Sequence, residues 1–112
     1  MKAAVVNAFG GGFAVEDIDI DEPRGREVLV DVKASGLCHS DLHFSVSNFG
    51  MEPPMVLGHE IAGVVAATGP DVTEFAVGDH VVGSLVQFCG ACQECLSGDT
   101  VRCAHPEATL RA

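Results

Sequence analysis

Short stretches in which apolar and polar residues alternate dominate the first part of the chain, and their period of two predicts β-strands. The clearest stretch is Glu27–Lys33, in which three valines face one way. Lys2–Val6 is a short apolar run, and the three glycines after it indicate a hairpin turn, because they do not form the G-x-G-x-x-G pattern of a nucleotide loop. The next stretch, Phe13–Asp21, alternates but slips once near Asp17, which predicts a strand with a bulge.

The later part of the chain also predicts strands, with one short helix between them. Leu57–Thr68 is dense in β-branched and small residues and predicts a buried strand, and a shorter strand is expected at His80–Gly83. Between them, Ser40 is predicted to N-cap a short helix that carries His43, and Ser45–Pro54 is predicted to be a loop. No stretch predicts a long helix. We therefore expect a compact β domain, a barrel whose closure hides its strand edges.

The composition fits one domain and limits the classes of partner that this domain could bind. The chain has 112 residues, and its hydrophobic fraction of 47 % includes no Trp or Tyr, so we expect a core of Val, Leu, Ile and Ala. Sixteen acidic and six basic residues give a net charge of −10, which argues against nucleic acid or an anionic membrane as partner. No apolar run has the length of a membrane span and no signal peptide is evident, so we expect a cytoplasmic protein.

Four of the five cysteines lie within fifteen residues, at the spacing C-x2-C-x2-C-x7-C. They are Cys89, Cys92, Cys95 and Cys103. Two-residue gaps let neighbouring thiols turn onto one ion, Gly90 and Gly98 permit the tight loop, and structural zinc takes four thiolates in a closed tetrahedron. A disulfide cluster or scattered buried thiols are the alternatives, but disulfides belong to oxidising compartments. We therefore predict a structural zinc loop at 89–103, with no open position for chemistry.

The fifth cysteine, Cys38, is far from this loop and lies in the segment Gly36–His43. About twenty residues later the chain reads His59-Glu60. A thiolate and an imidazole are two of the ligand types of open, catalytic zinc sites, in which three protein ligands leave a position for water or substrate. The chain therefore looks like a two-zinc protein, although two ligands alone leave the second metal pair an open question.

Several motifs, in order and at matching separations, resemble the GroES-like catalytic domain of the zinc-dependent medium-chain alcohol dehydrogenases. They are Glu27–Val30, Gly36–Asp41, Gly58–Glu60, Ala62–Val65, Gly78–Val81 and the four-cysteine loop. The resemblance runs from Met1 to about Cys103 and implies a mainly β fold, a partly open GroES-like barrel with short helices. The family also has a third zinc ligand further along the chain and a Rossmann domain, and neither is found in this sequence. We therefore expect residues 1–112 to be an incomplete catalytic domain.

The resemblance implies a role for each of four residues around the second metal. Cys38 and His59 match two ligands of the catalytic zinc. Glu60 matches a carboxylate that sits beside the metal. Asp41 matches the carboxylate that holds the ligand histidine, which fixes the tautomer and raises its basicity. Without the resemblance, Asp41 could be a solvated acid in the first turn of a helix.

Five further residues match positions in the family's proton path, cofactor site and substrate pocket. Ser40 and His43 match a proton relay from the alcohol to solvent, although Ser40 could be only a helix cap. His39 matches a position that approaches the pyrophosphate of the cofactor. Phe49 and Leu85 fall where the family lines its substrate pocket. No role is expected for the remaining histidines.

The function implied by the resemblance is oxidation of primary or secondary alcohols to aldehydes or ketones with NAD or NADP, assisted by zinc. The full-length enzyme is expected to be a homo-oligomer, and the fragment alone is expected to be inactive without its Rossmann domain. Within the superfamily, a polyol or threonine-type dehydrogenase is the alternative. Outside it, the alternatives are a non-enzymatic interaction module that folds around zinc and, ranked last, a co-chaperonin.

Overall fold

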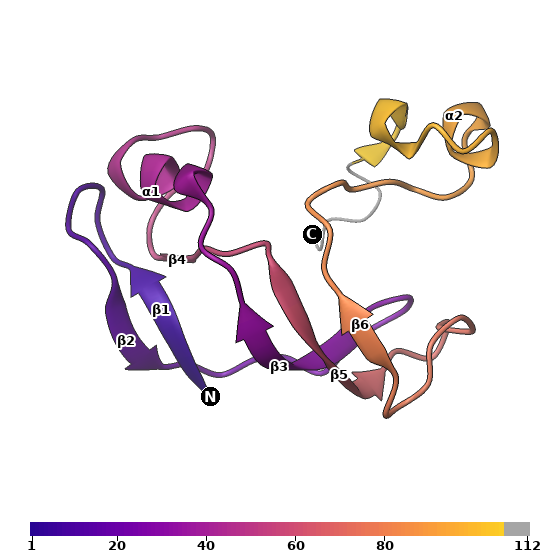
Figure 1. Ribbon diagram of the computed structural model, residues 1–112, viewed down its shortest axis with the longest axis horizontal. Helices are drawn as coiled ribbons and strands as arrows, with labels where there is room; N and C mark the ends of the chain where they lie inside the picture. The colour runs from indigo at the N-terminus through magenta and orange to yellow at the C-terminus, as the bar shows by residue number, and fades with distance from the viewer. Residues whose placement is uncertain (107–112) are drawn as a thin grey trace.

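The computed structural model describes residues 1–106, which form two three-stranded antiparallel sheets (Figure 1). The first sheet has the order β2-β1-β4, with β1 at Lys2–Val6, β2 at Ala14–Asp17 and β4 at Met55–Val56. The second has the order β3-β5-β6, with β3 at Val28–Ser35, β5 at Ile61–Thr68 and β6 at His80–Val82. The end of the predicted domain, residues 107–112, lies outside the described part.

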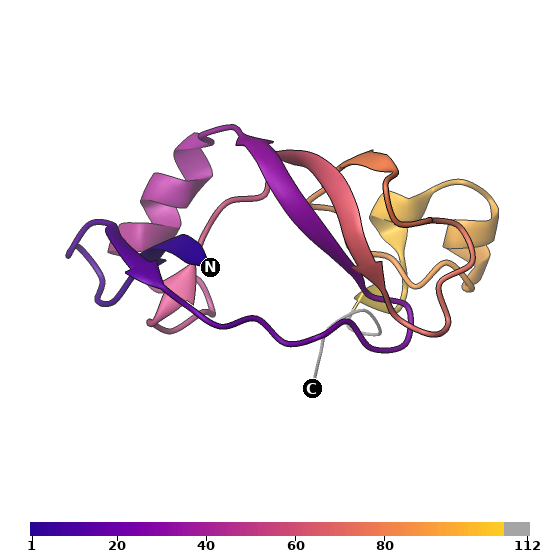
Figure 2. The ribbon, with the colours of Figure 1, turned by 90° about the horizontal axis from the view of Figure 1, so that it is seen from below.

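Short helices lie at the two ends of the molecule. The helix α1, His39–Val46, connects β3 to β4 and lies beside the first sheet, as Figures 1 and 2 both show. The helix α2, Gln93–Leu96, and the 3-10 helix η1, Thr100–Arg102, belong to the loop that follows β6, at the opposite end. Among the helices of residues 1–106, none is long and apolar enough to cross a membrane.

The predicted hairpin is confirmed, but its second strand is shorter than expected. β1 pairs antiparallel with β2 from Lys2 opposite Asp17 to Val5 opposite Ala14. The pairing is regular up to Asp17, where β2 ends, and the Met1 amino group donates to the Ile18 carbonyl at 2.7 Å. The predicted bulge near Asp17 is therefore wrong. The register shifts lie instead in β3, between Leu29 and Val30 and again after Val32.

Two boundaries in the middle of the chain also differ from the prediction. The strand expected from Leu57 begins at Ile61, and the short strand β4 lies between the expected loop, which ends at Pro54, and that expected start. The helix α1 begins at His39 with Cys38 as its N-cap, so the prediction that Ser40 caps it is wrong. Asp41 decides this start, because its carboxylate accepts the Cys38 N–H at 3.1 Å, as an acid at the third helical position does in a capping box.

The sheets are open, and the core is small. The two sheets share no strand, so the expected closure of the barrel is wrong, whereas the expected mainly β, partly open architecture is confirmed. The buried apolar side chains of the described residues are Val5, Val6, Met55 and Val65. The radius of gyration is 15.3 Å, compared with about 13 Å for a compact chain of this length. Many large apolar side chains are consequently exposed, and the expected compact shape is not found.

Candidate metal centres

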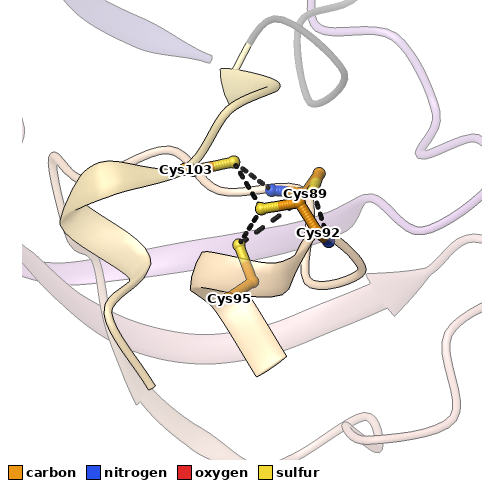
Figure 3. Close-up of side chains that lie close together, drawn as sticks. All are labelled: Cys89, Cys92, Cys95 and Cys103. Atoms are coloured by element: carbon orange, nitrogen blue, oxygen red, sulfur yellow. Dashed lines mark hydrogen bonds between the residues drawn. The ribbon is translucent and has the colours of Figure 1, made fainter. Parts of the chain in front are cut away.

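The four clustered cysteines meet in the loop after β6 (Figure 3). Their sulfur atoms all lie within 4.8 Å of one another, and every one of the four residues is half-buried. Cys92 caps α2 and Cys95 lies within it, whereas Cys103 follows η1. The two helical turns therefore bring thiols from both ends of a fifteen-residue segment to one point.

The spacing of the sulfur atoms fits a tetrahedral ion. The sulfur of Cys92 lies 3.4 Å from that of Cys95 and 3.9 Å from that of Cys103, and the sulfur atoms of Cys89 and Cys95 are 4.0 Å apart. A tetrahedron with zinc–sulfur bonds of about 2.3 Å has sulfur–sulfur edges of about 3.8 Å. A disulfide bond would need a sulfur–sulfur distance of about 2.05 Å, and all five cysteines are free. The donor set thus fits zinc, and the disulfide alternative is excluded.

Backbone N–H groups donate hydrogen bonds to two of the sulfur atoms. Cys89 Sγ accepts from the N–H groups of Ala91 and Cys92, both at 3.4 Å. These donors lower the pKa of Cys89 to about 6. Cys103 Sγ accepts from the N–H groups of Cys89 and His105, both at 3.3 Å. The two N–H groups at Cys89 stabilise negative charge on its sulfur before any ion is bound.

The opposite shift occurs at Cys95, where burial and then the neighbouring Cys92 thiol raise the pKa to about 12. Thiols this close cannot all ionise together unless a cation neutralises them. A divalent ion would replace those protons, so binding should release protons and become stronger as pH rises.

The turns of this loop depend on two glycines. Gly90 has a φ of +74° and Gly98 a φ of +89°, in the left-handed region that side chains disfavour. Gly98 follows α2, and its N–H donates to the Cys95 carbonyl at 3.1 Å. The expectation that these glycines permit the tight loop is confirmed.

A second group of possible ligands forms where β3 meets β5. The sulfur of Cys38, an imidazole nitrogen of His59 and a carboxylate oxygen of Glu60 all lie within 4.8 Å of one another. The antiparallel pairing places Ser35, at the end of β3, opposite Ile61, at the start of β5. The residues just beyond these strand ends are therefore held side by side, although they are about twenty positions apart in sequence.

The buried Asp41 joins the two halves of this second centre. Its Oδ2 accepts the Cys38 N–H at 3.1 Å, and its Oδ1 lies 3.4 Å from Nδ1 of His59. Asp41 is 9 % exposed, so the interaction is sheltered from water. A carboxylate at Nδ1 favours the tautomer that leaves Nε2 free to bind a metal. The role of Asp41 in holding a ligand histidine stays a prediction, which this contact supports.

The Cys38 thiol is also prepared for ionisation. The Ser40 hydroxyl donates to Cys38 Sγ at 3.2 Å. This hydroxyl, the Ser40 backbone N–H and then His59 lower the pKa of Cys38 below its ordinary value. The thiolate is the form that binds metal ions.

The relay residues lie on the same helix but are not bonded as a chain. The hydrogen bond from Ser40 goes to Cys38, while the exposed ring of His43 lies against that of His39, with centroids 4.5 Å apart. The relay therefore stays a prediction, as does the contact of His39 with a cofactor. Ser40 would have to turn from the thiol towards a bound alcohol for the path to form.

An open cavity of about 570 Å³ adjoins the second centre, and His59, Glu60 and Leu85 are among the residues that line it. Leu85 is thus near the possible ligands and is 69 % exposed. Phe49 packs on Phe44 instead, with ring centroids 5.1 Å apart, and is 58 % exposed. The substrate-pocket roles of Phe49 and Leu85 stay predictions.

The cavity lining also includes Gly36, which sequence reasoning used only as part of a motif. Its N–H donates to the Glu60 carbonyl at 2.7 Å and so continues the β3–β5 ladder up to the site. The sequence signal that could have identified Gly36 is an isolated glycine between a strand and a candidate metal ligand.

Known proteins resemble this chain in sequence. A family model described as the alcohol dehydrogenase GroES-like domain matches residues 24–111. The NDMA-dependent alcohol dehydrogenase of Amycolatopsis methanolica is 45 % identical over 102 residues, which are 91 % of this chain and 28 % of that protein. The chain therefore spans less than a third of the length of this relative.

Two solved structures show the same fold. The alcohol dehydrogenase zinc-binding domain protein from Burkholderia ambifaria has a TM-score of 0.83 and 45 % identity, over 96 % of this chain and 29 % of that one. An NAD-dependent alcohol dehydrogenase has a TM-score of 0.80 and 40 % identity, over 93 % of this chain and 32 % of that one.

The two centres predict different effects of losing one thiol. In the zinc-loaded chain, Cys95→Ser should lower the melting temperature by about 10 °C or more, because the binding energy of a closed site is folding energy. Cys38→Ser should lower it by less than about 4 °C, because it leaves the β3–β5 pairing intact. Thermal unfolding of both variants beside the wild type measures the difference. A larger loss for Cys38→Ser would overturn the assignment of the two centres.

Proposed function

Because the chain belongs to the alcohol dehydrogenase GroES-like domain family, we propose that it is the metal-binding part of a zinc-dependent enzyme that oxidises primary or secondary alcohols to aldehydes or ketones with NAD or NADP. The observation that carries the proposal is the group of Cys38, His59 and Glu60, joined by the buried Asp41. The rest of such an enzyme would correspond to the parts of the relatives that this chain does not cover.

In this proposal Cys38 and His59 hold the catalytic zinc, and Glu60 lies beside it. Zinc, when bound, supplies the Lewis acidity that lowers the pKa of an alcohol hydroxyl towards neutrality. Asp41 keeps a proton on His59 Nδ1 and fixes the direction of the ring. The N–H and O–H donors around Cys38 stabilise its negative charge and so favour the ligand form.

The proton of the alcohol would leave through Ser40 and His43. Ser40 can both accept and donate through its hydroxyl, and the exposed imidazole of His43 can pass a proton to water. His39 is proposed to meet the pyrophosphate of the cofactor, and Phe49 and Leu85 to line the substrate pocket. A nicotinamide cofactor, which the rest of the enzyme would hold, would supply the redox chemistry of the reaction.

The four-cysteine centre takes no part in this chemistry. A tetrahedron filled by four thiolates has no open position for water or substrate, so its proposed role is to fold the loop. A non-enzymatic zinc module would explain this loop as well. It gives no reason for Cys38, His59 and Glu60 to converge with a buried carboxylate, and the enzyme is therefore favoured.

The proposal can be tested in a chimaera in which this chain replaces the matched part of the NAD-dependent alcohol dehydrogenase. The zinc-loaded chimaera should reduce NAD with primary or secondary alcohols, and its Cys38→Ser variant should not. The 112-residue chain alone, with zinc, should show no turnover, because the nicotinamide ring must be held against the reacting carbon. A folded, zinc-loaded chimaera without alcohol-dependent turnover would contradict the function. Turnover by the chain alone would contradict the need for a second part.

The relay predicts a pH-dependent effect of His43→Gln in an active chimaera. The rate of alcohol oxidation should fall by about 10²-fold near neutral pH, the low end of what general acid–base assistance contributes. The loss should shrink at high pH, because hydroxide can then take the proton directly. The matched control is His80→Gln, which changes an exposed histidine on β6. Equal pH–rate profiles for the wild type and His43→Gln would show that His43 carries no proton.

A further inference from the structure

We infer that Gly36 is a positioning residue for the Glu60 carboxylate. Gly36 has no side chain, and Glu60 occupies the space that a side chain would fill, beside Cys38 and His59. This inference rests on the proposed function of the Cys38/His59 centre and assigns one more residue to it. Gly36 touches neither a substrate nor a metal in this account, and it acts only through Glu60.

The backbone does not explain why residue 36 is a glycine. Eight glycines of the described chain have a positive φ, and Gly36 is not one of them. An L-residue could therefore adopt its backbone conformation without strain. The reason must lie in the space around its Cα atom.

That space is filled by the Glu60 side chain along its length. A Cβ atom added at Gly36 would lie 3.0 Å from Glu60 Cβ and 3.1 Å from Glu60 Cδ, and it would overlap Oε2. Carbon atoms in favourable contact are about 3.5–4.0 Å apart. An alanine at this position would thus collide with both the root and the tip of the side chain.

Glu60 could not avoid the collision by moving its tip alone. Its carbonyl accepts the Gly36 N–H at 2.7 Å, and the next residue, Ile61, is paired with Ser35. The root of the side chain is therefore fixed by the sheet. With an alanine at 36, Glu60 would have to change rotamer, and its carboxylate would leave the position within 4.8 Å of the Cys38 and His59 ligand atoms.

Loss of this carboxylate should weaken metal binding at the second centre. A negative charge beside a cation stabilises it, and changing the groups around the direct ligands typically costs 10–100-fold in metal affinity. The effect of an added methyl at position 36 should therefore require Glu60. A general distortion of the sheet would act with or without Glu60.

A double-mutant cycle separates these two explanations. One equivalent of zinc first fills the four-cysteine loop of the 112-residue chain, and cobalt(II) is then titrated while its thiolate absorption band is recorded. Gly36→Ala and Glu60→Ala should each weaken cobalt binding about tenfold or more. The double variant should bind within about twofold of Glu60→Ala, because the carboxylate that the alanine at position 36 would displace is then already absent.

The matched control is Gly69→Ala, just after β5 and at the end of the β3–β5 ladder away from Ser35 and Ile61, since Gly69 also lacks a positive φ and its added Cβ would lie 2.4 Å from the Gly25 carbonyl oxygen. It should lower the melting temperature but leave the cobalt affinity of the folded chain within about twofold. Gly36→Ala with wild-type affinity would overturn the inference, and so would an equal further loss in the Glu60→Ala background.

A second measurement keeps the inference separate from the proposed function. If the wild-type chain binds no cobalt beyond the four-cysteine loop, the metal-binding role of Cys38 and His59 fails in this chain, and the chimaera described above decides the proposed function. A crystal structure of Gly36→Ala then decides the inference by itself. We expect the Glu60 carboxylate to have moved away from Cys38 and His59, and an unmoved carboxylate would overturn the inference.

Discussion

The antiparallel pairing of β3 with β5 is the constraint on which the second metal centre depends. Cys38 and His59 are separated by a helix, a loop and a short strand, and nothing local in the sequence joins them. The ladder that ends at Ser35 and Ile61 puts them side by side, and Asp41 then bonds to Cys38 and lies against His59. Any change that shifts the register of these strands would separate the ligands, even if each remained in place locally.

The two centres are therefore built in different ways. The four-cysteine loop gathers its ligands from fifteen consecutive residues through short helical turns, so its geometry needs little from the sheets. The Cys38/His59 centre is assembled by tertiary structure and borders an open cavity. A closed set of four thiolates suits a folding role, and an incomplete set beside a cavity suits exchange of small molecules. This difference is the physical basis for assigning chemistry to one centre only.

Much of the candidate site could be predicted from the sequence, because cysteine spacing and strand alternation are local signals. The hairpin, the long strands and the four-cysteine cluster follow from such patterns. The N-cap could not be predicted in this way, because Ser40 has the better intrinsic preference but Asp41 accepts the Cys38 N–H. The two-residue strand β4 and the open sheets depend on which segments pair, and no local pattern specifies that. The spatial role of Gly36 likewise appears only when Glu60 is placed against it.

The measurement that tests the central claim most directly is the zinc content of the chain before and after mild treatment with a chelator. Elemental analysis should show that the Cys89/Cys92/Cys95/Cys103 centre keeps its zinc, while the Cys38/His59 centre is filled weakly and loses its metal first. The reason is that one centre supplies a complete set of thiolates, whereas the other is open to solvent. Two zinc ions per chain that resist removal equally would contradict the account, and so would a chain whose only retained zinc depends on Cys38.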